Sequence, residues 1–400
     1  MADRVIFHVD MDGFFAAVES LSHPEADGRP MAVCGDPEKR RGIILAKNQL
    51  AKLAGVKTAE PIWQALRKCP DLLLLPPHRA LYEEYCERAN AVYERFTDRV
   101  ERAGIDESYL DMTGLYGMSD TGAELADAIR DAIRTELGLT VSVGASFCKA
   151  FAKMGSDLKK PDSTNVITRE NFERLLYPLP VGAMMYAGRV TVEALAKLGV
   201  HTIGQLAALT EDALTALLGK PGRSLYRCAR GLDDAPVVKT AELADVKSVG
   251  NSLTFRRDLV SQEDISLGLR ALAESVAFRL RRHGKKCCGV QVSIKDTELK
   301  TIDRQTQLAQ PTHLEKPIFD AALALVQRSW KLGKPIRLLS VTAINLTDAG
   351  AGAQISLFDG AGDAAKQEAL ARAVDTLKAR YGASVVKSAA VLKNDLGIGD

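Results

Sequence analysis

The sequence lacks the features that would place the chain in a membrane or in an oxidising compartment. No apolar run approaches the roughly 20 residues that a membrane-spanning helix needs. The N-terminus leads almost directly into a strand pattern, with no signal peptide before it. The seven cysteines are odd in number and scattered, and no two form a CxxC pair. We therefore expect no disulfide framework, no zinc site and no membrane partner, and we predict a cytoplasmic protein.

Internal repeats and low-complexity tracts are also absent. The 400 residues are too many for one ordinary domain, and a hydrophobic content of 46% is enough for several cores. The length predicts three or four small domains. The net charge of +2 excludes a strongly charged chain as a whole, but the charge is unevenly distributed.

Two short acidic strands carry most of the chemical information. Residues 5–12 (VIFHVDMD) and 104–111 (GIDESYLD) each form an apolar strand pattern interrupted by carboxylates, Asp10 in the first and Asp106 and Glu107 in the second. Removing several carboxylates from water costs several kcal/mol per charge unless a cation neutralises them. Carboxylate ligands that converge from two strands suit Mg²⁺. The pattern therefore favours two-metal phosphoryl or nucleotidyl transfer.

Residues 246–348 carry the basic charge, with 17 Lys and Arg residues against 10 Asp and Glu residues. Such an excess suggests a polyanionic partner, although a solubilising surface would look the same. The predicted elements are strands at 247–257, 289–295, 299–309 and 337–346, a helix from about 261 to 283, and a helix opened by Pro317. This β-α-β-β-α-β order is a split ferredoxin-like unit with one open sheet face, to which Arg256, Lys295 and Arg304 are available.

The remaining segments are read from their periodicity and their turns. Helices are predicted at 81–96 and 120–137 and a strand at 140–147. A smaller lobe is predicted at 13–78, punctuated by Pro30, Pro61, Pro70, Pro76 and Pro77. Residues 169–237 predict short helices, with a helix-hairpin-helix around Gly188 and Gly199 that could hold a DNA phosphate. Residues after 350 predict only one helix, near 363–381.

Three motifs resemble those of a known family. HVDMDGFFAAVES (8–20), GIDESYLDMTG (104–114) and VSVGASFCKAFAKMGSDLKKP (141–161) are similar, in order and spacing, to the palm motifs of the Y-family DNA polymerases, and within them to the bacterial DNA polymerase IV type. The resemblance covers about residues 1–348. It implies an α+β, multidomain right-hand polymerase with a ferredoxin-like palm, small fingers, a helical thumb and a βαββαβ little finger.

The resemblance also implies domain boundaries. The palm would comprise 1–12 and 79–168, the fingers 13–78, and the thumb with its helix-hairpin-helix 169–237. A linker at 238–245 would lead to the DNA-binding little finger at 246–348, followed by a tail at 349–400.

The resemblance implies the active-site roles as well. Asp10, Asp106 and Glu107, with the Met11 carbonyl, would bind two Mg²⁺ ions. Phe15 corresponds to the steric gate that excludes a ribose 2′-hydroxyl. The other residues implied at the substrate site are Phe14, which is also expected in the core, Lys160 as a triphosphate ligand, and Lys149 and Lys153 as weaker candidates for that role.

The fingers depart from the family pattern. Gln49 stands where the family has a tyrosine and Lys52 where it has an arginine, both contacts of the incoming triphosphate, and Ala46 lacks the usual hydroxyl. Lysine keeps the charge but not the planar fork that binds phosphate through two hydrogen bonds. Lys47 could compensate in part. These changes put nucleotide affinity in question more than the reaction itself. Cys148 likewise stands where an asparagine is usual.

The tail contains a second resemblance. Residues 354–359 (QISLFD) are similar to the peptide by which bacterial polymerases bind the sliding clamp. Gln354 would make polar contacts, and Leu357 and Phe358 would enter an apolar pocket. The alternative is a tail strand that packs on its own domain.

Together these patterns predict a template-directed DNA polymerase that extends a primer with dNTPs, at low fidelity and without proofreading, in translesion synthesis. A monomer on primer–template DNA is the simplest expectation. One alternative is a catalytically weak or inactive DNA- and clamp-binding accessory protein. Another is a nucleotidyl cyclase, which would share paired carboxylates but would need neither the hairpin, the basic sheet nor the clamp peptide.

Overall fold

The computed structural model describes most of the chain in two compact units. The described residues are 4–36, 38, 40, 42–114, 121–242, 245–350, 361–382, 385–386 and 394–398. The first unit comprises Met1–Gly35 and Ile43–Leu243, and the second comprises Asp36–Gly42 and Ala244–Asp400. None of the described helices is both long and apolar enough to cross a membrane.

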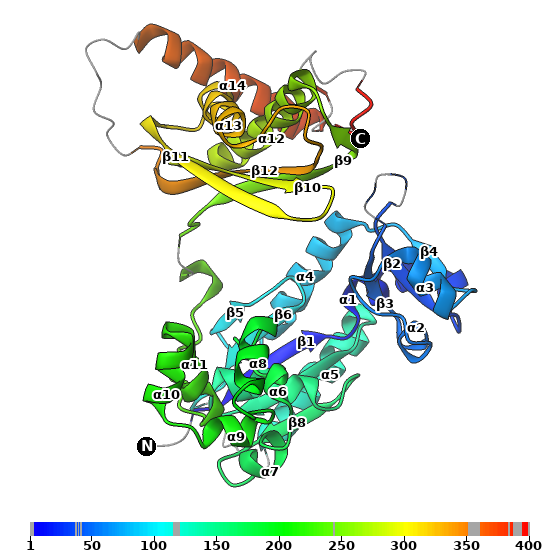
Figure 1. Cartoon of the computed structure of the whole chain (residues 1–400). Coiled ribbons are helices and arrows are strands. Elements are labelled where there is room, and N and C mark those ends of the chain that lie inside the picture. The colour runs from blue at the N-terminus through cyan, green and yellow to red at the C-terminus, as the bar shows by residue number, and fades with distance from the viewer. Residues whose placement is uncertain are drawn as a thin grey trace. The chain divides into compact units, whose positions relative to one another are not determined.

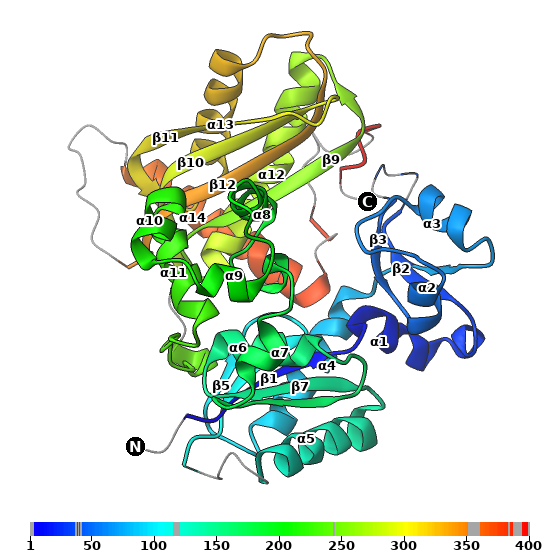
Figure 2. The same cartoon turned by 60° about the horizontal axis from the view of Figure 1, so that its bottom comes forward.

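A five-stranded sheet forms the centre of the first unit (Figure 1). Its strands, in spatial order, are β5 (Val100–Arg102), β6 (Glu107–Asp111), β1 (Ile6–Met11), β7 (Val141–Ser146) and β8 (Thr164–Ile167). Every residue of β1 and β7 is buried because helices cover both faces. Figure 2 shows these helices on opposite sides of the sheet, with α5 (Thr121–Leu137) on one side and α6 (Lys149–Asp157) on the other. The core beneath α5 also includes α4 (Arg79–Tyr93).

Helix α6 lies unusually close to the sheet because β7 contains Gly144. A Cβ atom at this position would lie 1.9 Å from the Ala152 carbonyl oxygen and 2.4 Å from the Ser156 nitrogen. No side chain fits in that space. Gly144 thereby lets α6 pack directly on β7 and β1, which carries its lysines toward the acidic strands.

A smaller lobe follows β1 and contains the prolines seen in the sequence. Its three-stranded sheet has the order β3 (Ile44–Lys47), β2 (Met31–Cys34) and β4 (Leu73–Leu75). The helical elements of the lobe are α1 (Phe14–Ser22), η1 (Pro24–Ala26), α2 (Gln49–Leu53) and α3 (Ile62–Lys68). Two small cores, one on each side of this sheet, hold the lobe together.

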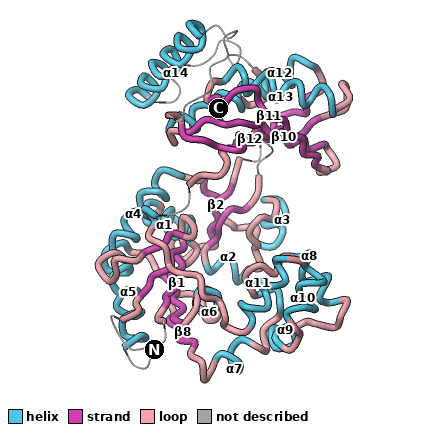
Figure 3. Tube along the Cα trace, turned by 90° about the vertical axis from the view of Figure 1, so that its left-hand side faces the viewer, coloured by secondary structure: helices cyan, strands magenta, loops and turns pink. Residues whose placement is uncertain are grey.

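Short helices complete the first unit, as the sequence predicts, and Figure 3 shows α8 to α11 as one cluster. Gly199, with φ of +74°, makes the turn between α8 and α9, and Thr202 caps α9 through a capping box. The helical elements are α7 (Phe172–Leu176), η2 (Val181–Ala183), α8 (Arg189–Ala196), α9 (Ile203–Ala207), α10 (Glu211–Leu218), α11 (Lys220–Ala229) and η3 (Thr240–Glu242).

The segment expected as a linker is held on the first unit through residue 240. The Val238 nitrogen donates to Glu101 at 2.6 Å, and the Thr240 hydroxyl donates to the Val100 carbonyl at 3.1 Å. Lys239 forms an ion pair with Asp98. Residues 238–240 therefore run along β5.

The second unit has the predicted β-α-β-β-α-β order. Its elements are β9 (Val249–Leu259), α12 (Gln262–Arg282), β10 (Lys285–Asp296), β11 (Thr301–Thr312), α13 (Glu315–Ser329) and β12 (Ile336–Asp348). The antiparallel sheet has the order β11-β10-β12-β9, so both helix crossovers skip one strand, as in a split β-α-β unit. Ser261 caps α12 and Gly284 follows its end, where the sequence placed both signals.

The strand register corrects one expected position on the open sheet face. Arg304 pairs with Val292, whose side chain is buried under the helices, and residues paired across antiparallel strands share a face. Arg304 therefore lies on the helix side of edge strand β11. Lys295 pairs with Thr301 on the open face, and exposed Arg256 follows buried Phe255.

Helix α14 (Ala361–Tyr381) begins two residues before the predicted helix and lies on the helix side of the second unit (Figure 1). Arg281 forms an ion pair with Asp375 and Lys378 with Glu274. The peptide at 354–359, with Gln354, Leu357 and Phe358, lies outside the described residues.

Candidate active site

The two acidic strands of the sequence are neighbours in the sheet. Asp10 of β1 pairs with Glu107 of β6, so both carboxylates project from the same face. The Met11 nitrogen donates to the Asp106 carbonyl at 3.0 Å, which ties Asp106 to β1. Asp106 itself precedes β6 in the turn from β5, whereas the sequence predicted it inside a strand. Like charges directly opposite each other destabilise a sheet, so the pair needs compensation.

Lys160 compensates the first carboxylate. Its ammonium lies 2.7 Å from Asp10 and 2.9 Å from Asp157. Burial raises the pKa of Asp10 to about 7, against the opposing effect of Lys160. Burial and the neighbouring Glu107 also raise the pKa of Asp106. The site is therefore costly to keep ionised unless cations are close by.

Lys153 of α6 compensates the second carboxylate. Its ammonium lies 2.7 Å from Glu107, and the His8 ring nitrogen Nε2 lies 3.6 Å from the other oxygen of that carboxylate. His8 and Lys153 together lower the pKa of Glu107. His8 is fully buried and is held by the Ser156 hydroxyl, 2.8 Å from Nδ1. Both Lys153 and Ser156 belong to α6, whose close packing on β7 depends on Gly144.

A network behind the site fixes the loop that carries Lys160. Asp12 accepts a hydrogen bond from the Asp162 nitrogen and another from the Ser142 hydroxyl, both at 2.8 Å. Arg130 and Arg134 both form ion pairs with the Asp162 carboxylate. These contacts position the ammonium of Lys160 in front of Asp10.

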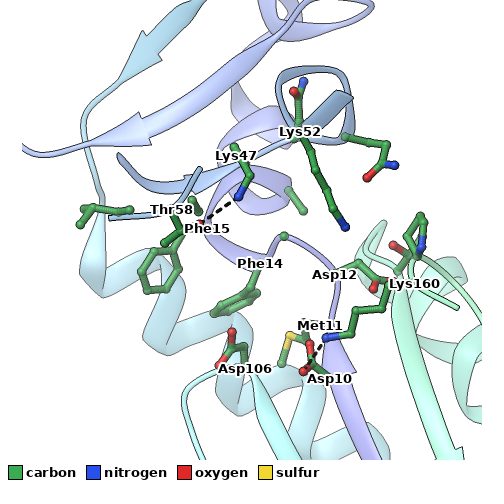
Figure 4. A pocket seen from close by; sticks show the side chains of 18 of the residues that line it. Asp10, Met11, Asp12, Phe14, Phe15, Lys47, Lys52, Thr58, Asp106 and Lys160 are labelled. Carbon is green, nitrogen blue, oxygen red and sulfur yellow. Dashed lines mark hydrogen bonds and ion pairs between the residues drawn. The ribbon is translucent and has the colours of Figure 1, made fainter. Parts of the chain in front are cut away.

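A cavity of about 640 Å³ opens in front of these carboxylates (Figure 4). The large sheet and the small lobe both contribute to its wall. Its lining includes Asp10, Met11, Asp12, Gly13, Phe14, Phe15, Lys47, Asn48, Gln49, Lys52, Thr58, Asp106, Glu107, Asp157 and Lys160. The lining thus includes Asp10, Met11, Asp106 and Glu107, expected at the metal site, and Phe14, Phe15, Gln49, Lys52 and Lys160, expected at the substrate site, but neither of the weaker candidates Lys149 and Lys153.

The small lobe places polar side chains on the opposite wall. Gln49 opens α2, whose N-terminus is capped by the Asn48 side chain, and Lys52 lies one turn further on. The Lys47 ammonium lies 3.0 Å from the Thr58 hydroxyl. Burial and the charge of Lys52 lower the pKa of Lys47.

Aromatic side chains form the floor beside the carboxylates. Phe14 is buried in the core, as expected, and also borders the cavity. Phe15 is partly exposed and stacks on Tyr82 at a centroid distance of 4.1 Å. The Tyr82 hydroxyl donates to the buried carboxylate of Glu19, which the His78 side chain also contacts.

Several contributors were missed in the sequence. Thr58 and Tyr82 have no motif of their own, and Asp12 lies within the first acidic motif but was given no role there. The contribution of all three follows only from the fold. Lys153 was a weaker triphosphate candidate, but in the structure it is the partner of Glu107. Lys149 turns away to Glu101 at 2.6 Å and does not line the cavity. The residues expected to bind DNA, Gly188, Gly199, Arg256, Lys295 and Arg304, do not line it either.

The donor set fits a divalent cation once the lysines are considered. Across the described part of the chain, no three acidic, histidine or cysteine side chains already form a metal-binding cluster. Ammonium groups occupy an oxygen of Asp10 and one of Glu107. A divalent ion could take over this role because hard oxygen ligands from carboxylates are what Mg²⁺ prefers.

The fold and the sequence both match known proteins. A solved structure described as a Y-family DNA polymerase chimera superimposes with a TM-score of 0.77 over 86% of this chain and 99% of that one, at 24% sequence identity. This likeness shows a Y-family polymerase fold. The sequence matches the impB/mucB/samB family over residues 9–157 and the C-terminal domain of that family over residues 246–357. The chain belongs to the impB/mucB/samB family.

Curated relatives cover nearly the full length. The protein named DNA polymerase IV of Acetivibrio thermocellus is 42% identical over 391 residues, which is 98% of each chain. DNA polymerase IV 1 of Bacillus subtilis is 37% identical over 98% of this chain and 94% of its own. The resemblance drawn from the three motifs is thereby confirmed.

Proposed function

We propose that this chain is a template-directed DNA polymerase of the DNA polymerase IV type, which extends a primer 3′-hydroxyl with dNTPs in translesion synthesis. The observation that carries the proposal is the pairing of Asp10 with Glu107 at the mouth of a large cavity, in a chain whose DNA polymerase IV relatives match up to 98% of its length. One such site among the described residues makes a monomer on DNA the simplest proposal.

Asp10, Asp106, Glu107 and the Met11 carbonyl would hold two Mg²⁺ ions. Bound ions would supply Lewis-acid chemistry, which acidifies the primer 3′-hydroxyl and offsets charge on the leaving pyrophosphate. The pairing of β1 with β6 holds the carboxylates on one face, and Lys160 and Lys153 neutralise them when no ion is bound. Burial keeps their surroundings partly free of water. Lys160 and Lys153 would be released from the carboxylates on ion binding.

The rest of the cavity would bind the nucleotide. Phe15 would lie under the deoxyribose and exclude a 2′-hydroxyl. Lys52 and Gln49 on one wall and Lys160 on the other would contact the triphosphate. Lysine at position 52 binds phosphate as a point charge, so we expect weaker geometric control there than an arginine gives.

Primer–template DNA would contact elements outside the cavity. The hairpin between α8 and α9, near Gly188 and Gly199, offers backbone N–H groups to a phosphate. On the second unit the open sheet face offers Arg256 and Lys295. We further propose that residues 354–359 bind the sliding clamp and that the protein acts in the cytoplasm.

The decisive experiment is primer extension with Mg²⁺ by the parent and by Asp106→Ala, beside a DNA-binding assay. We expect extension to fall by at least about 1,000-fold with binding nearly unchanged, since a metal ligand is lost. The matched control is Asp71→Ala, an exposed carboxylate outside the cavity, which should extend like the parent. A parent that binds primer–template but does not extend it would instead favour the non-catalytic accessory protein.

A further inference from the structure

One cation of the cavity has no role in the proposed reaction. Lys47 ends β3, and its ammonium contacts the Thr58 hydroxyl at 3.0 Å. Within the described ranges, neither Lys47 nor Lys52 has a carboxylate at ion-pair distance, whereas Lys160 and Lys153 each do. The small-lobe wall therefore carries positive charge that the protein itself does not neutralise.

The two lysines point to different ends of the cavity (Figure 4). Lys52 extends toward Asp12 and Lys160, at the end proposed for the triphosphate. Lys47 turns the other way, toward Thr58 and Phe15. Because Phe15 is proposed to lie under the sugar, the Lys47 end would receive the nucleoside and its base.

The backbone and the ammonium group of Lys47 are both held in place. A Cβ at Gly13 would lie 3.2 Å from the Lys47 carbonyl oxygen, so β3 passes close to the loop that follows β1. At the tip, Thr58 accepts a hydrogen bond from the ammonium and leaves two N–H groups for a ligand. A donor that is fixed and partly removed from water binds acceptors more strongly than a free surface lysine.

We propose that Lys47 donates a hydrogen bond to an acceptor atom at the edge of the nascent base pair, a ring nitrogen or a carbonyl oxygen of the incoming or the templating base. It would thereby set which base pairs form fastest. Guanine presents two adjacent acceptors, O6 and N7, and is the base that lysine contacts most often. This inference rests on the proposed function, since Phe15 defines the sugar end.

The test is single-nucleotide insertion opposite each of the four template bases, with kcat and KM measured for the parent and for Lys47→Met. We expect Lys47→Met to lower kcat/KM by roughly 5- to 50-fold for pairs that contain guanine, and less for the others. Lys47→Arg should retain most of the preference because it keeps the charge and the donors. Lys57→Met, a neighbouring exposed lysine outside the cavity, is the matched control and should behave like the parent.

Base analogues distinguish the two sources of the acceptor. The 7-deaza and 3-deaza purines each remove one ring nitrogen, from the major-groove and the minor-groove edge respectively. Placed in turn in the incoming nucleotide and in the template, the analogue that lacks the contacted nitrogen should lower the parent's rate and leave Lys47→Met unaffected. A contact to a carbonyl oxygen responds to neither analogue and shows only the larger loss for pairs that contain guanine.

Equal losses for all four pairs, insensitive to the analogues, would indicate a phosphate contact and overturn the inference. A parent that extends primers, with base preferences unchanged in Lys47→Met, would overturn the inference alone. A parent without template-directed extension would overturn the proposed function as well. Melting temperatures of the variants identify any loss that comes from misfolding.

Discussion

Phe15 lies flat against Tyr82, with ring centroids 4.1 Å apart and ring planes 11° from parallel. The Tyr82 hydroxyl donates a hydrogen bond to Glu19, which is itself fully buried. The Tyr82 ring therefore cannot easily move. A side chain that excludes a 2′-hydroxyl must resist displacement by a small oxygen atom. The stack on an anchored tyrosine supplies this resistance to Phe15.

Phe15→Ala is therefore expected to admit ribonucleotides. Truncation removes the ring that would meet the 2′-hydroxyl, so the preference for dNTP over rNTP should fall by at least about 100-fold, or roughly 3 kcal/mol. Single-nucleotide insertion of dCTP and CTP measures this. Tyr82→Phe keeps the stack and should retain most of the selectivity. Unchanged sugar selectivity in Phe15→Ala would refute the gate.

Gly144→Ala tests whether the close approach of α6 builds the acidic site. The added methyl would lie 1.9 Å from the Ala152 carbonyl oxygen, so α6 must move away from β7. We expect a loss of about 3 kcal/mol in unfolding free energy, the upper range for overpacking. Extension should fall too, because Lys153 and Ser156 move with the helix.

The control for this change is Gly182→Ala, where the nearest atom to the new Cβ is 3.6 Å away. Urea unfolding of both variants gives the comparison. If Gly144→Ala unfolded with the parent's midpoint, the sheet and α6 would have to be less tightly packed than the structure indicates.

The sequence predicted much of this structure because several signals are local. The second unit follows from strand alternation and from the caps at Ser261 and Gly284. The acidic strands could be identified because their carboxylates interrupt apolar runs. The expected open-face position of Arg304 was wrong because its face depends on strand register, which pairs Arg304 with the buried Val292.

Contacts between distant segments could not be predicted in this way. The stack of Phe15 on Tyr82 joins residues in different helices, and Lys153 reaches Glu107 from a helix placed by Gly144. Phe15 and Glu107 belong to motifs that the sequence shows, but no local pattern indicates that Phe15 stacks on Tyr82 or that Lys153 pairs with Glu107. Lys47 was noticed only as compensation for missing phosphate contacts, and its direction toward Thr58 comes from the fold alone.

The second unit should lose stability in acid through Asp264. Hydrogen bonds from Arg257 lower the pKa of Asp264 to about 2, from an ordinary value of 3.8. Because the folded-state pKa is the lower one, this stabilisation is full above pH 4 and disappears as the pH falls toward 2. Arg257 is partly exposed, so we expect only about 1 kcal/mol.

Acid titration of Asp264→Asn beside the parent measures this effect. Trp330 lies in the second unit, and Trp63→Phe removes the other tryptophan, so fluorescence can follow this unit in the full chain. The parent should exceed Asp264→Asn in unfolding free energy at pH 6, and this difference should shrink below pH 4. Asp320→Asn, at an exposed helical ion pair, is the control. A difference that is constant with pH would mean that Asp264 acts only as a helix cap.

The clamp proposal is best tested by Leu357→Ala with Phe358→Ala. Deleting 354–359 would shorten the connection between β12 and α14, whereas the double substitution keeps its length. We expect clamp-stimulated synthesis to fall by at least about 10-fold, because the two apolar anchors carry most of such binding. Synthesis without clamp should match the parent. Equal stimulation of both proteins would contradict the docking role.

Lys153→Met tests whether lysines stand in for metal ions at the acidic site. Without its ammonium, Glu107 faces Asp10 across the sheet with one cation fewer, and a partly buried pair broken in this way costs about 1–2 kcal/mol. The variant should therefore melt a few degrees below the parent in EDTA. Millimolar Mg²⁺ should then raise its melting temperature more than it raises the parent's, since the ion restores the missing charge.

Lys149→Met is the matched control: it breaks the ion pair with Glu101, outside the cavity, and its destabilisation should not respond to Mg²⁺. Equal Mg²⁺ shifts in parent and Lys153→Met would mean that the ion does not replace this lysine at Glu107.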